Sequence, residues 1–140
     1  MSDRCGDRRG LRAARRALLP VAVMLAIAAG SLRPLPAGLR AGPDKLVHAG
    51  VWAVLAAGWS WALGPLAAPG PRIAGVAFGL SGAWGGCDEL IQARVPWRDA
   101  DPLDLAADLA GAAAGALGWL WYRRLRSAGG PPGPGAAGGC

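Results

Sequence analysis

Carboxylates gather in the second half of this chain, inside or beside apolar runs that are long enough to cross a bilayer. Asp88 and Glu89 lie near the end of one such run, and Asp104 and Asp108 open another. Ionisable side chains at membrane depth are costly and usually mark substrate, ion or proton sites. The only histidine, His48, stands at the start of a third apolar run. Carboxylates beside a histidine and cations suit general acid–base chemistry or the binding of a polar head group.

The composition places the chain in the membrane class. It has 140 residues, of which 53% are hydrophobic, and a mean hydropathy of +0.28. Four segments approach the roughly 20 mostly apolar residues that a transmembrane helix needs. These segments, joined by short loops, are residues 17–32, 46–63, 73–92 and 103–122. We therefore expect an all-α membrane protein that is a bundle of four transmembrane helices.

The basic residues predict how these helices are oriented. Ten of the fifteen Lys and Arg fall before the first segment, between the second and third, or after the fourth. Because cytoplasmic loops are enriched in Lys and Arg, both termini are expected in the cytoplasm. Residues 1–16 then form a basic cytoplasmic tail, residues 17–126 the membrane domain, and residues 127–140 a disordered cytoplasmic tail. The net charge of +6 reflects this topology and attraction to anionic lipid, not nucleic-acid binding.

Aromatic residues support the same orientation. The inner interface would carry an aromatic belt of Trp59, Trp61, Trp119, Trp121 and Tyr122, and Trp97 would mark the outer interface. The first segment allows a second interpretation, because residues 8–31 also have the Arg-rich start, apolar middle and small residues of a signal peptide. Whether this segment is cleaved stays open, and the later topology is the same in either case.

Glycines recur at helical spacing on the last two segments. Steps of three and four residues define one face with Gly75, Gly79, Gly82, Gly86 and Glu89, and another with Asp104, Asp108, Gly111, Gly115 and Gly118. Small residues let membrane helices approach closely, so these faces should pack on each other or on the second segment. The expected helix contacts are at Gly82, Gly86, Gly111 and Gly115. Such packing would bring Glu89 close to Asp108, where two carboxylates cannot both ionise cheaply.

These residues resemble the motif series of VanZ-like membrane proteins. The match consists of Pro43, Asp44, Lys45, Leu46, Val47 and His48, then residues 88–92, then Arg98, Asp104, Asp108, Gly111 and Gly115. Its order and spacing over residues 43–118 are more specific than any single motif. The resemblance implies a small multi-pass protein of the bacterial inner membrane, in a family named for a member linked to low-level resistance to the glycopeptide teicoplanin. It implies no established reaction.

The chain departs from that family pattern at two positions. Asp108 stands where Asn is frequent, which adds a charge, and Trp52 stands where Tyr is common, which puts a hydroxyl role there in doubt.

We expect an outward-facing polar site. The candidate catalytic residues are Glu89, His48 and Asp108. Glu89 or Asp108 would be the general base, and His48 would be a general acid–base group. The candidate binding residues are Asp44, Lys45, Gln92, Arg98 and Asp104. The ligand would be an envelope lipid, its head group or precursor, or a glycopeptide-related molecule. The sequence does not separate an enzyme that acts on this ligand from a protein that only binds it.

The same polar residues are open to further interpretations. The cluster could be an ion-pair network that only fixes helix packing. His48, Glu89 and Asp108 could instead bind a divalent metal, although no HExxH-like spacing occurs. A transporter is disfavoured, because the charges lie at the outer end and leave no polar path through the midplane. The sequence indicates neither a cofactor nor an oligomeric state.

The predicted topology can be tested with reporter fusions. A reporter fused after Arg126 should behave as cytoplasmic, and one inserted near Trp97 should behave as external, because of the asymmetry in basic residues. A periplasmic signal from the C-terminal fusion would contradict this orientation.

Overall fold

Four helices make up the described part of the chain. The computed structural model describes residues 3–34, 43–97 and 101–128. The helices in chain order are α1 (Asp3–Ser31), α2 (Pro43–Leu63), α3 (Gly70–Gln92) and α4 (Pro102–Ala128). Since no strand occurs in these residues, the predicted all-α class is confirmed for them.

The first and last helices of the chain, α1 and α4, extend beyond the apolar segments from which they were predicted. Helix α1 begins at Asp3, within the basic tail, and α4 continues to Ala128. Arginine and alanine are good helix formers, so charged flanks can prolong a helix past its apolar part. Helix α1 also continues through Pro20, whose buried ring lies opposite Gly58 of α2. A Cβ added at Gly58 would lie 3.7 Å from the Cβ of Pro20, so the small residue leaves room for the ring.

In the part of the chain that the structure describes, three helices are long and apolar enough to cross a membrane, namely Gly6–Ser31, Lys45–Leu63 and Pro102–Ala128. Only 11% to 28% of their most apolar windows is buried inside the protein. Large apolar side chains such as Leu18 and Leu117 are therefore exposed, at 70% and 63% of their surface. An apolar surface of this extent needs an apolar environment. The chain is thus a multi-pass membrane protein.

Helix α3 is not among these three helices. Its 23 residues would extend about 35 Å at 1.5 Å per residue, which is long enough to span a bilayer. It is, however, rich in glycine and carries Arg72, Asp88 and Glu89. The expected fourth span therefore stays a prediction.

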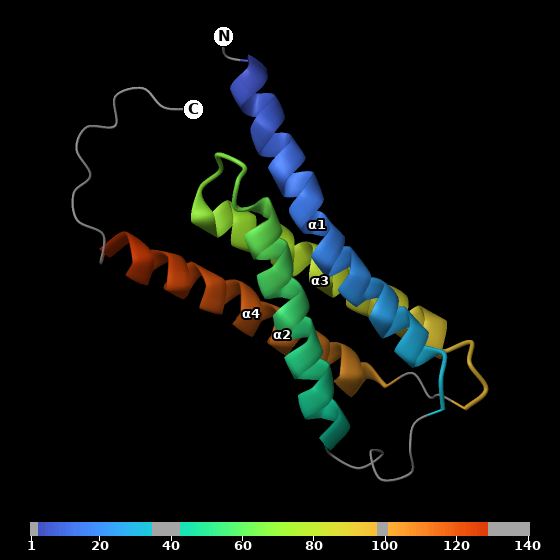
Figure 1. The fold of residues 1–140 in the computed structure, drawn as a ribbon. Helices are drawn as coiled ribbons and strands as arrows, with labels where there is room; N and C mark the ends of the chain where they lie inside the picture. Colours follow the sequence, from blue (N-terminus) through green and yellow to red (C-terminus); the bar gives the residue numbers. More distant parts are fainter. Residues whose placement is uncertain (1–2, 35–42, 98–100, 129–140) are drawn as a thin grey trace.

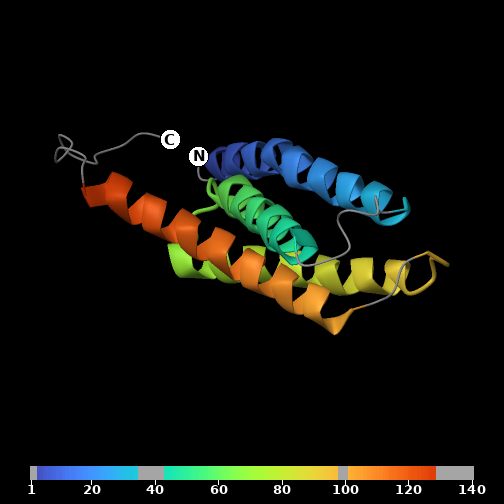
Figure 2. The ribbon, with the colours of Figure 1, turned by 90° about the horizontal axis from the view of Figure 1, so that it is seen from below.

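Helix α2 lies at the centre of the arrangement. It packs between α1 on one side and α3 and α4 on the other (Figure 2). Successive helices run back and forth, so that the end of α1, the start of α2, the end of α3 and the start of α4 lie at one end of the molecule (Figure 1). The opposite end carries the connection between α2 and α3 and the end of α4.

The core consists mainly of small side chains packed around one tryptophan. One buried cluster of the core comprises Trp52, Ala56, Ala74, Ala112 and Ala116. The closest approach is between α2 and α4, where Gly111 and Gly115 lie directly against the backbone of Ala49 and Ala53. A Cβ at Gly111 would lie 2.7 Å from the Cα of Ala49. Of the two partners expected for the glycine face of α4, the structure selects α2.

The buried face of α3 differs from the predicted glycine face. A Cβ at Gly75, Gly79 or Gly86 would meet no atom within 4 Å, and of the glycines on the predicted face only Gly82 approaches another helix, at Leu109. The residues that α3 buries are Ile73, Ala74, Ala77, Ser81, Gly85, Asp88 and Gln92. Buried polar side chains need hydrogen-bond partners inside the bundle, whereas a glycine can stay on the outer surface without such a cost. Asp88 and Gln92 therefore turn α3 away from the orientation that glycine spacing predicts.

The contact between α2 and α4 should tolerate no added side chain. We expect Gly111→Ala to destabilise the protein by about 1–3 kcal/mol, because the new methyl group would push α4 from the α2 backbone. The control is Gly118→Ala on the same helix, where a Cβ meets nothing within 4 Å. Thermal unfolding in detergent measures both variants, and equal unfolding temperatures would contradict this packing.

Candidate polar site at one end of the bundle

All four helices contribute polar side chains to one end of the bundle. This group, which we call the carboxylate site, comprises Ser31, Lys45, His48, Asp88, Glu89, Gln92, Asp101, Asp104 and Asp108. Lys45, His48, Glu89 and Asp101 are partly exposed, whereas the other members are buried. The site thus has an accessible rim and a buried acidic interior.

A histidine–carboxylate pair joins α2 to α4. Nδ1 of His48 lies 2.8 Å from Oδ1 of Asp108, which is fully buried. If Asp108 is ionised, it accepts a hydrogen bond from Nδ1–H, and Nε2 becomes the atom that can exchange a proton with a ligand. The imidazole also stacks on the Trp52 ring, with centroids 5.7 Å apart. Two contacts therefore hold the imidazole in one orientation.

Lys45 connects the start of α2 to the start of α4. Its Nζ lies 2.5 Å from Oδ2 of Asp101 and also forms an ion pair with Asp104. Asp101 in addition accepts a hydrogen bond from the backbone N–H of Leu103 at 2.9 Å and so caps α4. These two interactions lower the pKa of Asp101 below its ordinary value, Lys45 having the larger effect. Asp101 therefore keeps its charge, and its bond to Lys45, at lower pH than a free aspartate would.

Asp88 joins α1 to α3. Its Oδ2 accepts hydrogen bonds from Ser31 Oγ and from Gln92 Nε2, both at 2.8 Å. Asp88 is only 1% exposed, so this carboxylate depends on protein partners. Its other oxygen, Oδ1, is buried and has no hydrogen-bond partner within the part of the chain that the structure describes.

Two further carboxylate oxygens share this condition. Oδ2 of Asp108 and Oε1 of Glu89 are also buried, and neither has a hydrogen-bond partner among the described residues. Glu89 interacts electrostatically with Asp104, Asp108 and His48, which places it in the same cluster. Buried polar atoms in native proteins are nearly always paired, so unpaired ones indicate a bound water, ion, proton or ligand group. The interior of the site thus has three acceptors that require donors.

Gly85 makes room for Asp108. A Cβ at Gly85 would lie 3.3 Å from Oδ2 of Asp108 and 3.0 Å from Nε1 of Trp52. The same Nε1 donates a hydrogen bond to the carbonyl oxygen of Ser81 at 3.1 Å. The absence of a side chain at Gly85 therefore lets α3 approach the pair formed by His48 and Asp108.

Most of the residues expected at the site come together. His48, Glu89 and Asp108 lie in it, as do the binding candidates Lys45, Gln92 and Asp104. Arg98 and the side chain of Asp44 lie outside the described residues. Within the described residues, no group of three or more His, Cys, Asp or Glu could hold a metal ion, so the His48, Glu89 and Asp108 set does not have metal-site geometry.

Sequence reasoning misses four residues of the arrangement, namely Ser31, Gly85, Asp88 and Asp101. The sequence marks Asp88 as a costly charge without assigning it to the site. The missed signal is the spacing of Ser81, Gly85, Asp88 and Gln92, which follows steps of four, three and four and places these residues on one helix face. Ser31 carries no comparable signal, because it is a single hydroxyl at the end of an apolar helix.

The opposite end of the molecule carries arginine–aromatic pairs. Among the described residues, three guanidinium groups lie over aromatic rings. The pairs are Arg16 with Trp61, Arg123 with Trp119, and Arg126 with Tyr122. Such pairs are typical of a membrane interface, where the ring lies near head-group level and the cation reaches water. Trp61, Trp119 and Tyr122 belong to the predicted inner aromatic belt.

Comparison of this chain with family models, with curated proteins and with solved structures gives no match.

The bond between Ser31 and Asp88 should measurably attach α1 to α3. A double-mutant cycle with Ser31→Ala and Asp88→Ala should give a coupling energy of about 0.6–1.7 kcal/mol, which runs from the average to the largest value measured for hydrogen bonds between membrane helices. The control cycle pairs Ser31→Ala with Asp104→Ala, which share no bond and should be additive. Additive effects in both cycles, measured by unfolding in detergent, would contradict the contact.

Proposed function

We propose that the carboxylate site binds the hydrogen-bond-donating head group of an envelope lipid. The observation that carries this proposal is the set of three buried, unpaired acceptors, Oδ1 of Asp88, Oε1 of Glu89 and Oδ2 of Asp108. An ammonium or hydroxyl group supplies the donors that these atoms lack. The partly exposed rim gives such a group a polar point of entry at the end of the bundle.

The proposal includes the membrane topology. In it, α3 is the fourth span, both termini are cytoplasmic, and the carboxylate site faces the outer side of the bacterial inner membrane. The asymmetry in basic residues supports this orientation. The arginine–aromatic pairs at the end opposite the carboxylate site are consistent with it.

The VanZ-like resemblance is part of the same proposal. It rests on the motif residues of the chain, of which Lys45, His48, Glu89, Gln92, Asp104 and Asp108 share one site. If this chain shares the property of the member that gives the family its name, its expression in a sensitive bacterium should lower susceptibility to teicoplanin. A ligand related to the glycopeptide, or the envelope precursor that it recognises, would also offer hydroxyl and amide donors to the site.

A second candidate is acid–base chemistry on the bound lipid. The pair formed by His48 and Asp108, 2.8 Å apart, has the arrangement of a base oriented by a carboxylate. Nε2 of His48 would take or give the proton, and Glu89 would serve as the second acid–base group.

A purely structural role is the alternative that an experiment must separate from binding. The bonds of Ser31 to Asp88, of His48 to Asp108 and of Lys45 to Asp104 each join two helices, as a packing network would. Removing one partner of such a network would leave the other unpaired at membrane depth and would lower stability.

Lipid preference tests the proposal. In nanodiscs, the wild type should retain phosphatidylethanolamine over phosphatidylcholine by about tenfold, because only the former has N–H donors and a hydrogen bond to a charged group contributes about 1.5 kcal/mol or more. Glu89→Gln and His48→Gln keep most hydrogen bonding but remove charge and proton transfer, so they should lose this preference and fold normally. Native mass spectrometry measures retained lipid, and thermal unfolding measures folding.

The matched control is Cys87→Ser, which changes an exposed residue beside Asp88 and should keep the wild-type preference. A wild type without lipid preference would refute the proposal. Parallel loss of unfolding temperature and lipid binding in Glu89→Gln and His48→Gln would instead support the packing network.

A further inference from the structure

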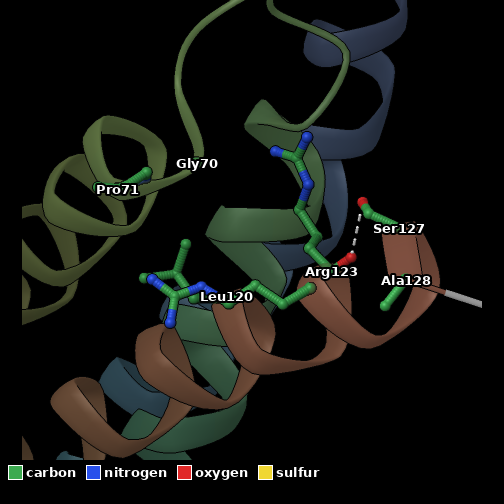
Figure 3. Close-up of a pocket in the computed structure, with 7 residues that line it drawn as sticks. Gly70, Pro71, Leu120, Arg123, Ser127 and Ala128 are labelled. Carbon is green, nitrogen blue, oxygen red and sulfur yellow. Dashed lines mark hydrogen bonds between the residues drawn. The ribbon is translucent and has the colours of Figure 1, made fainter.

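An open pocket of about 500 Å³ lies at the end of the molecule opposite the carboxylate site. It is lined by Gly70, Pro71, Leu120, Arg123, Arg124, Ser127 and Ala128. Figure 3 shows Leu120 and Arg123 of α4 on the side of the start of α3 at Gly70 and Pro71, and Ser127 hydrogen-bonded to the carbonyl oxygen of Arg123. We call it the arginine pocket.

The charge of the arginine pocket is positive and locally uncompensated. The described residues that line it include two arginines and no carboxylate. The sequence contains no acidic residue from 46 to 87 or from 109 to 128, so neither α4 near the pocket nor the start of α3 supplies one. Within the described residues, the ion pairs involve Lys45 and His48 and no arginine. The pocket therefore favours an anion from outside the protein.

The local geometry brings further positive potential to the same place. Helix α3 begins at Gly70 with no side-chain cap and no acidic residue in its first turn, so the positive end of its dipole is unopposed. A Cβ at Gly70 would lie 3.8 Å from Nη1 of Arg123, which shows that the guanidinium reaches the start of α3. The ring of Trp119 lies 4.9 Å from the Arg123 guanidinium carbon and helps to hold this group in position.

The apolar surroundings indicate that the anion belongs to a lipid. Leu120 lines the pocket. Leu117 lies one helical turn before it on the same face of α4, farther from the pocket, and 63% of its surface is exposed. An acyl chain can lie along this face while its phosphate contacts the arginines, since guanidinium groups bind phosphate oxygens in a bidentate way. A free phosphate would use the arginines but not the apolar face.

We propose that the arginine pocket binds the phosphate of an anionic phospholipid. This site is separate from the carboxylate site in position, in charge and in ligand chemistry. It would anchor the start of α3 and the end of α4 to one leaflet, whichever way the protein is oriented in the membrane.

The experiment uses the full chain in nanodiscs that contain phosphatidylglycerol and phosphatidylcholine, with native mass spectrometry of the retained lipid. The wild type should retain phosphatidylglycerol preferentially. Arg123→Gln and Arg124→Gln should each lower this retention about fivefold, the effect of one cation beside an anionic lipid. Arg126→Gln removes the same charge from the same helix, but Arg126 does not line the pocket, so retention should stay near the wild-type value.

A second measurement separates lipid from free phosphate. Phosphatidylglycerol should raise the unfolding temperature of the wild type in detergent, and inorganic phosphate should not. Equal loss of retention in Arg126→Gln, or retention unchanged in all three variants, would overturn the proposal. Inorganic phosphate that stabilises the protein as much as the lipid would overturn the lipid assignment.

Discussion

The close backbone contact between α2 and α4 is the constraint on which the rest of the structure depends. Gly111 and Gly115 bring α4 against the backbone of Ala49 and Ala53. His48 is the neighbour of Ala49, and Asp108 lies one turn before Gly111, so the 2.8 Å bond between them requires this approach. Backbones that lie this close in a membrane protein gain van der Waals contact without burying polar groups. Packing in the middle of the bundle thus determines the geometry of the polar end.

The two ends of the molecule carry opposite chemistry. One end gathers buried carboxylates with three unpaired oxygens, and the other gathers arginines over aromatic rings with no acidic residue in the arginine pocket. Unpaired buried acceptors contribute nothing to stability, because their desolvation is not offset by a hydrogen bond. A network that served packing alone would not need Asp88 or Asp108 to keep an oxygen free. This excess of acceptors is what favours ligand binding over a purely structural role.

The sequence predicts the helices well and their rotations only in part. Apolar length and composition correctly indicate an all-helical membrane protein, and glycine spacing correctly places Gly111 and Gly115 on a common face. The same rule fails for α3, because the face with Gly75, Gly79 and Gly86 competes with the face of Asp88 and Gln92. Only the second face meets polar partners, and one of them, Ser31, lies 57 positions away in the chain. Such a distant pairing cannot be read from local spacing.

An experimental structure of the full chain in native lipid tests most directly whether the carboxylate site holds a donor group from a ligand. We expect density for a lipid head group within hydrogen-bond distance of Oδ1 of Asp88 and Oδ2 of Asp108. If both oxygens were instead paired with side chains of the protein itself, with no density beside them, ligand binding at this site would be contradicted.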